Sequence, residues 1–409
     1  MSKTTLRQRF SFTSTQKKVL FALASMVGLR MLGLFLVLPV FTLYGLRFTS
    51  SRFLVGFAFG AYALVMAILQ IPFGRLSDRI GRRKVLVLGM TLFSAGSFLC
   101  ALPPLFPHSW QIGELIFGRL VQGGGAIISV AFATVADYIE AERRSTAMAV
   151  LGIPIGVSFA VGIIGGPILA GWFGTASLFW MTGVLGLGTD VLLLRYLRDE
   201  APQREAPAPM SEVFSHPPLI AYAAGGFLIN FFMTTFFFYF PLLATGQHHL
   251  KMSQYYMLLL PMMVVSAFTM FGFSQGADKG AARPLAAFAY VMFIPSFLLL
   301  FEPAWLGQDP KRLIALFLAG ALFYIGFTGL EPILPSLVSK ASPGTAYGTS
   351  LGFYNTAQFV GSAVGGPLAG FLSNYSPDRT MFTMIAAATV GVVMMAATPA
   401  PTRAQRARR

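Results

Sequence analysis

The chain has 409 residues, of which 55% are hydrophobic and only 11% are charged. Soluble domains carry about 25% charged residues, so this composition excludes an ordinary soluble enzyme and indicates a protein with many membrane-spanning helices. The net charge of +15 comes from cations that cluster in short segments between apolar runs. They do not form the continuous basic surface that nucleic acid requires, so binding of nucleic acid is not expected.

Several kinds of site are not expected from this sequence. The single cysteine, Cys100, excludes an internal disulfide. The histidines have no Cys or carboxylate beside them at ligand spacing, so no metal site is expected. They are His108, His216, His248 and His249. No Gly-x-x-x-x-Gly-Lys-[Ser/Thr] phosphate loop occurs, and the first apolar run is too long for a cleavable signal peptide.

Charge clusters and Pro/Gly punctuation divide the chain into apolar segments long enough to cross a bilayer as helices, which takes about 20 residues. The chain is therefore expected to be an all-α membrane protein with twelve transmembrane helices. The predicted spans are 17–46, 53–74, 85–103, 111–136, 145–171, 176–197, 218–245, 252–275, 284–303, 313–337, 346–372 and 378–398.

The distribution of Lys and Arg between the two ends of these spans predicts the orientation of the chain. With the N-terminus inside, 22 cations fall on the cytoplasmic side and six on the opposite side. Those six are Arg47, Arg52, Lys251, Lys311, Arg312 and Arg379. Cytoplasmic loops carry the excess of cations, so we expect a multi-pass protein of the bacterial inner (plasma) membrane with both termini in the cytoplasm.

The second half of the sequence repeats features of the first half at an offset close to 200 residues. The corresponding pairs are Gly165-Gly166-Pro167 with Gly365-Gly366-Pro367, Asp78-Arg79 with Asp278-Lys279, and Pro39 with Pro241. Repeats of six helices with a substrate path between them are typical of secondary transporters. We predict an N-terminal six-helix half at 1–197, a proline-rich cytoplasmic linker at 198–217 and a C-terminal six-helix half at 218–409.

A polar segment separates the second and third predicted spans. It reads Gly74-Arg75-Leu76-Ser77-Asp78-Arg79-Ile80-Gly81-Arg82-Arg83-Lys84. Five cations and one carboxylate cannot lie in hydrocarbon, so this segment is expected to be a tight turn at a membrane surface. A lone acid among cations favours a specific ion pair, and the alternative is a solvated loop whose charges only orient the chain.

The spacing Gly-x-x-x-Asp-Arg-x-Gly-Arg-Arg in this segment resembles the signature between the second and third helices of major facilitator superfamily transporters. Arg119 to Gly125 in the fourth span is similar to the family pattern Arg-x-x-Gln-Gly-x-Gly, and Gly162 to Gly171 in the fifth resembles a motif associated with antiporters. Residues Leu29 to Pro39 resemble the first helix of bacterial YajR-type drug/proton antiporters, whose soluble C-terminal domain is not expected here. The resemblance implies the major facilitator fold and no enzymatic activity.

Two arginines are predicted inside the bilayer, Arg119 in the fourth span and Arg30 in the first. A cation there costs roughly 2.5–3.5 kcal/mol on insertion scales and is retained mostly when it is paired or lines a cavity. The resemblance implies that Arg119 helps to hold or move a proton near a carboxylate. The alternative is a structural cation bonded to backbone carbonyl groups, and for Arg30 structure and transport remain equally open.

A helix-packing motif is predicted at Gly162, Gly166 and Pro167, and again at Gly366 and Pro367. Small residues at three- and four-residue spacing let two transmembrane backbones approach closely, and proline bends a helix by removing a backbone donor. By resemblance, such a seam also seals one side of a transport cavity.

A cytoplasmic gate is implied by the family pattern. In that pattern Arg82 bridges Asp78, at the end of the second span, and Asp137, at the end of the fourth. A partly buried arginine that holds two carboxylates stabilises one of two conformations, here the one closed to the cytoplasm.

The substrate cavity is expected to be lined by polar side chains at helical spacing, because unsatisfied amides are costly in hydrocarbon. These residues are Gln70, Gln122, Asn230, Thr234, Tyr324, Asn355 and Gln358. Many phenylalanines surround Asn230 and Thr234, and an aromatic wall with few polar groups suits a lipophilic substrate. The alternative is that these rings face lipid.

Glu331 in the tenth span is the predicted proton carrier. Tyr324, Thr328 and Glu331 recur at intervals of four and three, so they share one helix face. Burial favours the neutral form of a carboxyl group, which can then bind a proton in one conformation and release it in another. A carboxylate locked permanently to an arginine or tyrosine is the alternative, and Glu114 and Asp190 are the next candidates.

Together these features predict a secondary active transporter, namely a proton-coupled antiporter that exports lipophilic or drug-like compounds by alternating access. The proton gradient is the expected energy source, and no cofactor is expected. The chain is expected to act as a monomer in the lipid bilayer on a small-molecule substrate. One alternative is a proton symporter that imports a sugar, organic acid or peptide. Another is a membrane-embedded lipid enzyme, for which no catalytic cluster is evident.

Overall fold

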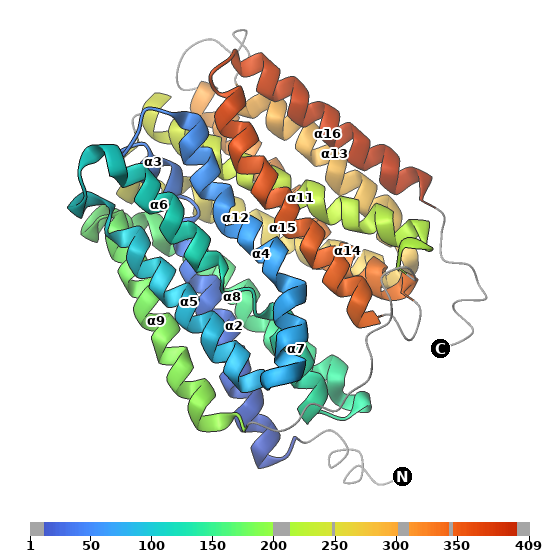
Figure 1. The fold of residues 1–409 in the computed structure, drawn as a ribbon. Helices are drawn as coiled ribbons and strands as arrows, with labels where there is room; N and C mark the ends of the chain where they lie inside the picture. The colour runs from blue at the N-terminus through green and yellow to red at the C-terminus, as the bar shows by residue number, and fades with distance from the viewer. Residues whose placement is uncertain (1–11, 199–212, 248–249, 302–310, 343–346, 399–409) are drawn as a thin grey trace. The chain divides into compact units, whose positions relative to one another are not determined.

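The structure is a computed structural model that describes residues 12–198, 213–247, 250–301, 311–342 and 347–398. These residues are almost entirely helical, and no β-strand occurs among them (Figure 1). Ten helical segments in the described part of the chain are long and apolar enough to cross a membrane. The predicted all-α membrane architecture is therefore confirmed.

The helices follow one another with short connections. In the first half they are α2 (Ser14–Val37), α3 (Phe41–Gly45), α4 (Arg52–Ile80), α5 (Arg82–Ala101), η1 (Pro103–Leu105), α6 (His108–Gly123), α7 (Ile128–Tyr138), α8 (Ala141–Phe173) and α9 (Thr175–Tyr196). In the second half they are α11 (Pro217–Leu242), η2 (Leu243–Gln247), η3 (Met252–Gln254), α12 (Tyr256–Gly276), η4 (Ala277–Ala281), α13 (Ala282–Leu300), α14 (Lys311–Ala341), α15 (Tyr347–Leu372) and α16 (Pro377–Ala397).

These helices correspond to the twelve predicted spans. The apolar segment Tyr256–Leu300 contains two of them, α12 and α13, because the chain turns at Gly280, whose φ of 98° favours glycine. Helix α15 is not among the ten apolar segments, and polar residues such as Asn355 and Gln358 lower its hydropathy. The predicted fourth span is a single apolar segment that comprises α6 and α7.

Two predicted spans are interrupted. The first span ends its regular helix at Val37, because Pro39 lacks a backbone N–H, and continues as α3. The fourth breaks between α6 and α7, where Gly124 packs against Leu92 of α5 and leaves no room for a side chain. A Cβ atom at Gly124 would lie 2.9 Å from Leu92 Cδ1, so the glycine allows the two helices to approach closely.

The chain divides into two compact units by its contacts. Unit 1 comprises Met1–Leu38 and Ile68–Glu205, and unit 2 comprises Pro39–Ala67 and Ala206–Arg409. This division differs from the predicted halves, because α3 and the first part of α4 belong with the second half of the sequence. Residues 199–212 of the predicted linker lie outside the described residues, so a domain boundary there stays a prediction.

In unit 1, α2 packs on α8 and α9, and α5 packs on α6 and α9 (Figure 1). The predicted glycine motif of α8 lies at the contact with α2. Gly162 lies against Phe35, and the space that a side chain at Gly166 would need is filled by the carbonyl oxygen of Leu36. The two backbones therefore touch directly, as small residues in transmembrane helices allow.

In unit 2, α11 packs along α15, and α13 packs on α14 and α16 (Figure 1). The first part of α4 also packs on α15, where Gly56 meets Gly366 backbone to backbone and Gly60 lies against Pro367. Near the same contact, Arg52 Nη1 donates a 3.2 Å hydrogen bond to the carbonyl oxygen of Ser373. The motif predicted at Gly366 and Pro367 thus lies at the contact between α15 and the first part of α4.

Replacing Gly166 with alanine should lower the free energy of unfolding by about 1–3 kcal/mol, because the backbone of Leu36 cannot give way to the new methyl group. The matched control is Gly152→Ala on the same helix, where nothing lies within 4 Å of the added atom. That variant should keep or slightly raise stability, because alanine favours helix. Thermal unfolding in detergent compares the two, and equal stability for both variants would contradict the proposed contact.

Candidate functional site

A charged cluster lies where α4 ends and α5 begins. Gly81 separates these helices and has φ 102°, a backbone conformation that favours glycine. The turn leaves Asp78 in the last turn of α4 and makes Arg82 the first residue of α5. The glycine in the sequence pattern therefore has a direct structural reason.

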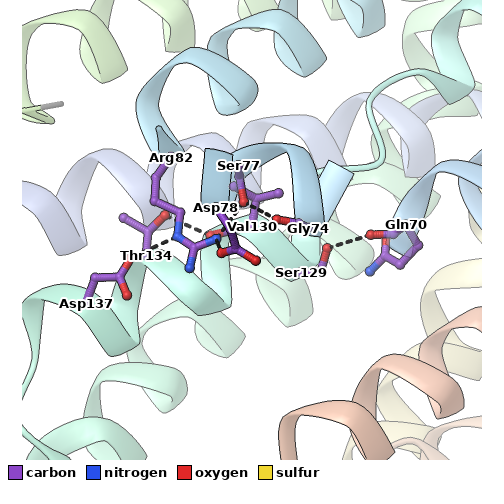
Figure 2. Close-up of polar contacts among 9 residues, drawn as sticks. All are labelled: Gln70, Gly74, Ser77, Asp78, Arg82, Ser129, Val130, Thr134 and Asp137. Atoms are coloured by element: carbon purple, nitrogen blue, oxygen red, sulfur yellow. Dashed lines mark hydrogen bonds and ion pairs between the residues drawn. The ribbon is translucent and has the colours of Figure 1, made fainter. Parts of the chain in front are cut away.

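Arg82 contacts both carboxylates that the sequence pattern assigns to it. Its Nη1 lies 2.5 Å from Asp78 Oδ1, and its Nε lies 2.8 Å from Asp137 Oδ2 in α7 (Figure 2). The side chains of Arg82 and Asp137 are only 12% and 17% exposed, whereas that of Asp78 is 41% exposed. Screening by water weakens the Asp78 contact, so the pair with Asp137 contributes more to holding α5 against α7.

Ser77 completes this cluster. It is fully buried, its hydroxyl accepts a 2.6 Å hydrogen bond from Arg82 Nη1, and it donates to the carbonyl oxygen of Gly74 (Figure 2). The sequence analysis did not single out Ser77. Its position next to Asp78, inside a segment already recognised by its charges, is the signal that could have identified it.

A second polar chain joins α6 to α5. Arg119 is 7% exposed and donates to the side-chain oxygen of Gln122, and Gln122 Nε2 donates to Ser97 Oγ over 2.8 Å. The structure thus joins Arg119, which was predicted to take part in proton coupling, to Gln122, which was predicted to line the substrate cavity. Ser97 was missed, although Thr91, Ser94 and Ser97 recur at intervals of three along α5.

Arg30 is 1% exposed, and its guanidinium carbon lies 5.6 Å from the centre of the Phe93 ring. A cation over an aromatic face is stabilised by the ring quadrupole. On the neighbouring helix α9, Asp190 accepts a 3.0 Å hydrogen bond from Thr91. Its other oxygen, Oδ1, is buried and has no hydrogen-bond partner among the described residues.

The residues of α11 that were predicted to line a cavity form hydrogen bonds within unit 2. Asn230 Nδ2 donates to the carbonyl oxygen of Gly226, and Asn230 Oδ1 accepts from Ser362 of α15, both at 3.4 Å. Thr234 donates a 2.8 Å hydrogen bond to the carbonyl oxygen of Asn230. Asn355 and Gln358 of α15 are half-buried. In unit 1, Gln70 is 1% exposed, and its side-chain amide has no hydrogen-bond partner in the described part of the chain.

The polar face predicted on α14 is unevenly buried. Tyr324 is completely buried, and its ring lies against the rings of Phe236 and Phe323. Thr328 is 8% exposed and donates a 2.7 Å hydrogen bond to the carbonyl oxygen of Tyr324. Glu331 is half-buried, so its side chain is more exposed than those of Tyr324 and Thr328 on the same face.

No cluster of three or more His, Cys, Asp or Glu residues that could hold a metal ion occurs among the described residues. Of the four histidines, His248 and His249 lie outside the part of the chain that the structure describes.

Replacing Arg82 with alanine should lower the free energy of unfolding by about 1–3 kcal/mol, because the partly buried Asp137 carboxylate loses its cation. Arg82→Lys should restore little, since an ammonium cannot bond through two separate nitrogens to two carboxylates. Thermal unfolding of the purified protein measures both effects. The control is Arg79→Ala, at an exposed position in the same segment, and a loss of stability as large as that of Arg82→Ala would argue against a specific bridge.

Comparisons with known proteins agree with this architecture. The family model described as Major Facilitator Superfamily matches residues 23–366. The chain is 31% identical over 380 residues to the inner membrane transport protein YajR of Escherichia coli, which covers 91% of this chain and 81% of that protein. It is also 34% identical over 151 residues to the multidrug resistance protein B homolog of Mycobacterium tuberculosis, covering 36% of this chain and 26% of that protein.

The fold is also that of solved transporters. The crystal structure of a D-xylose-proton symporter superposes with a TM-score of 0.72 at 16% identity and covers 92% of this chain and 96% of that chain. The family model spans most of the sequence, and the similarity to YajR extends over nearly all of it. The predicted family is therefore confirmed, and this chain, a multi-pass membrane transporter and not an enzyme, belongs to the major facilitator superfamily.

Proposed function

We propose that this transporter is a proton-coupled antiporter that exports lipophilic or drug-like compounds across the bacterial inner membrane by alternating access. The observation that carries the proposal is the position of Glu331. The described part of unit 2 contains three carboxylates, and Asp278 and Asp378 lie at helix ends, whereas Glu331 lies inside α14. Ionisable groups at such positions are costly in a membrane and typically serve in proton relays.

The surroundings of Glu331 also support a group that changes its protonation state. No described residue forms a hydrogen bond or an ion pair with its carboxyl group, so none of the described cations holds it in the ionised form. Its backbone lies beside Pro332 and Pro335, which remove backbone hydrogen bonds from this part of α14 and make bending easier. A half-buried carboxyl group on a bendable helix can exchange water for an apolar environment when the conformation changes.

Alternating access requires a contact that is made in one state and broken in the other. The bridge from Arg82 to Asp78 and Asp137 suits this role, because it joins the ends of α4, α5 and α7 at a turn. A differential free energy of a few kcal/mol is enough to shift a two-state population strongly. We assign this bridge to the cytoplasmic gate, in the state closed to the cytoplasm.

The proposed substrate class follows from the walls of unit 2. The rings of Phe227 and Phe231 stack beside Asn230, and few polar groups interrupt the aromatic surface of α11. A mainly apolar surface with a few hydrogen-bonding groups suits lipophilic compounds. The partial similarity to a protein named for multidrug resistance supports the same class.

The proposed function is tested in proteoliposomes with an imposed pH gradient and a panel of lipophilic dyes that begins with ethidium. An antiporter should take up dye when the interior is acidic, because outward proton flow then drives inward movement of the dye. Uptake driven by an acidic exterior would instead indicate symport and overturn the proposal. A dye that moves only down its own gradient at every pH would show that transport is not coupled to protons.

Glu331→Gln should abolish uptake driven by the pH gradient, because glutamine imitates the protonated carboxyl group but cannot release a proton. Exchange of labelled for unlabelled dye across the membrane, which needs no net proton movement, should persist. The control is Asp378→Asn, at an exposed position in the first turn of α16, which should transport normally. Uphill transport by Glu331→Gln at the normal rate would place the proton carrier elsewhere.

From the cation distribution we propose that both termini lie in the cytoplasm. A reporter active only in the cytoplasm should therefore be active when fused after Arg409. The same reporter inserted between η2 and η3 should be inactive, because the connection between the seventh and eighth spans would lie on the opposite side. Activity at both positions would contradict the proposed topology.

A further inference from the structure

We propose that Gln16 is a positioning residue for the cytoplasmic gate, because it holds the end of α7 in the place where Asp137 meets Arg82. This inference rests on the proposed function, which assigns the bridge from Arg82 to Asp137 to that gate. It adds a further helix to the gate, since Gln16 lies in the first turn of α2.

The first observation is that the side-chain amide of Gln16 forms hydrogen bonds through both of its ends. Gln16 is 7% exposed, and its Oε1 accepts a 3.0 Å hydrogen bond from the backbone N–H of Thr13. Its Nε2 donates to the carbonyl oxygen of Tyr138 over 3.1 Å and to Glu140 Oε2 over 3.2 Å. These contacts fix the orientation of the amide, because the reverse orientation would turn its oxygen toward two other oxygens.

The second observation is that the carbonyl group held by Gln16 lies one residue from the gate. Helix α7 ends at Tyr138, and the last carbonyl groups of a helix have no N–H partner within it. Gln16 supplies that partner for Tyr138. The preceding residue, Asp137, accepts the 2.8 Å hydrogen bond from Arg82 Nε. A shift of the end of α7 that breaks one of these contacts therefore disturbs the other.

The contact with Glu140 involves a charge. Glu140 is the N-cap residue of α8 and belongs to the two-residue connection that follows α7. Hydrogen bonds from its own backbone N–H and from Gln16 lower the pKa of its carboxyl group, so Glu140 is ionised at neutral pH. Because Glu140 is exposed, water weakens this contact, and the bond to the Tyr138 carbonyl group is the second tie between Gln16 and the connection.

The end of α7 is also joined to α9. The Tyr138 hydroxyl donates a 3.2 Å hydrogen bond to the carbonyl oxygen of Arg198 and accepts one of 3.3 Å from the Arg198 backbone N–H. Contacts from α2, α5 and α9 thus meet on residues 137–140. With all three in place, the backbone that carries Asp137 cannot turn, and loss of the Gln16 contact removes one of the three restraints.

Gln16 has a second role that the test must separate from this one. Thr13 and Gln16 form a capping box, in which Thr13 Oγ1 accepts a 3.2 Å hydrogen bond from the Gln16 backbone N–H. The box stabilises the start of α2 and does not involve Asp137. Since the cap uses Gln16 Oε1 and the connection uses Nε2, the two roles respond to different substitutions.

The test compares Gln16→Glu with Thr13→Ala in the full-length protein. Gln16→Glu keeps an oxygen for the Thr13 N–H but replaces the donor with a second oxygen, which repels the Tyr138 carbonyl group and Glu140. Thr13→Ala removes the cap hydroxyl and leaves the contacts of Gln16 Nε2 in place. Both changes are made alone and together with Asp137→Asn, and ethidium uptake driven by the pH gradient is measured beside thermal unfolding in detergent.

We expect Asp137→Asn to slow uptake, and Gln16→Glu to slow it about tenfold, as the loss of a hydrogen bond to a charged group implies. Added to Asp137→Asn, Gln16→Glu should slow uptake further by roughly twofold or less, because the contact that it positions is already lost. Thr13→Ala should lower the unfolding temperature and leave uptake close to that of the unchanged protein. Gln16→Ala should show the same dependence on Asp137 and decides the matter if Gln16→Glu does not fold.

Equal slowing by Gln16→Glu with and without Asp137→Asn would overturn the inference, because independent effects multiply. Slowing by Thr13→Ala as large as that by Gln16→Glu would overturn it too, since the cap alone would then explain the effect. If Asp137→Asn takes up ethidium at the normal rate, the gate of the proposed function fails, and the role of Gln16 fails with it. If Asp137→Asn slows uptake and Gln16→Glu does not, only the role of Gln16 fails.

Discussion

The hydrocarbon of a bilayer offers no hydrogen-bond partners, so every polar group of this chain that lies inside the membrane must find its partner in the protein. The described spans are helices for this reason, because a helix satisfies its own backbone. Hydroxyl groups follow the same rule, and Thr134 and Thr182 each donate to a carbonyl oxygen of their own helix. Arg119, Gln122 and Ser97 satisfy one another in a chain between two helices.

Several buried polar groups depart from this rule, among them the hydroxyl groups of Ser94, Thr175 and Tyr255. Glu331 and Tyr354 in unit 2 and one oxygen of Asp190 in unit 1 lack hydrogen-bond partners among the described residues. A membrane protein that keeps such groups sacrifices stability, and a change of protonation or conformation is a physical reason to keep them. The Arg82 cluster is different, because it lies at a turn where water also reaches Asp78 and where contacts can break at modest cost.

The boundary between the two compact units falls within helix α4. Its first part packs through Gly56 on α15 in unit 2, and its last turn is joined to α5 and α7 in unit 1 through Asp78 and Arg82. Residues of helix α4 therefore belong to both compact units. The sequence division at the proline-rich linker did not reveal this, because contacts between segments distant in sequence leave no local pattern of composition.

The sequence by itself determined the helical membrane class, the number of spans and the family, because hydropathy, proline and glycine act locally and the charged turn has a fixed spacing. It also identified Arg82, Asp78 and Asp137, because a known pattern connects them. Only the tertiary structure decided the partners of these residues, such as Ser77 for Arg82 and Ser97 for Gln122. It also buried Tyr324 among phenylalanines while leaving Glu331 half-buried on the same face, because the helices packed around α14, and not its own periodicity, decide which groups meet water.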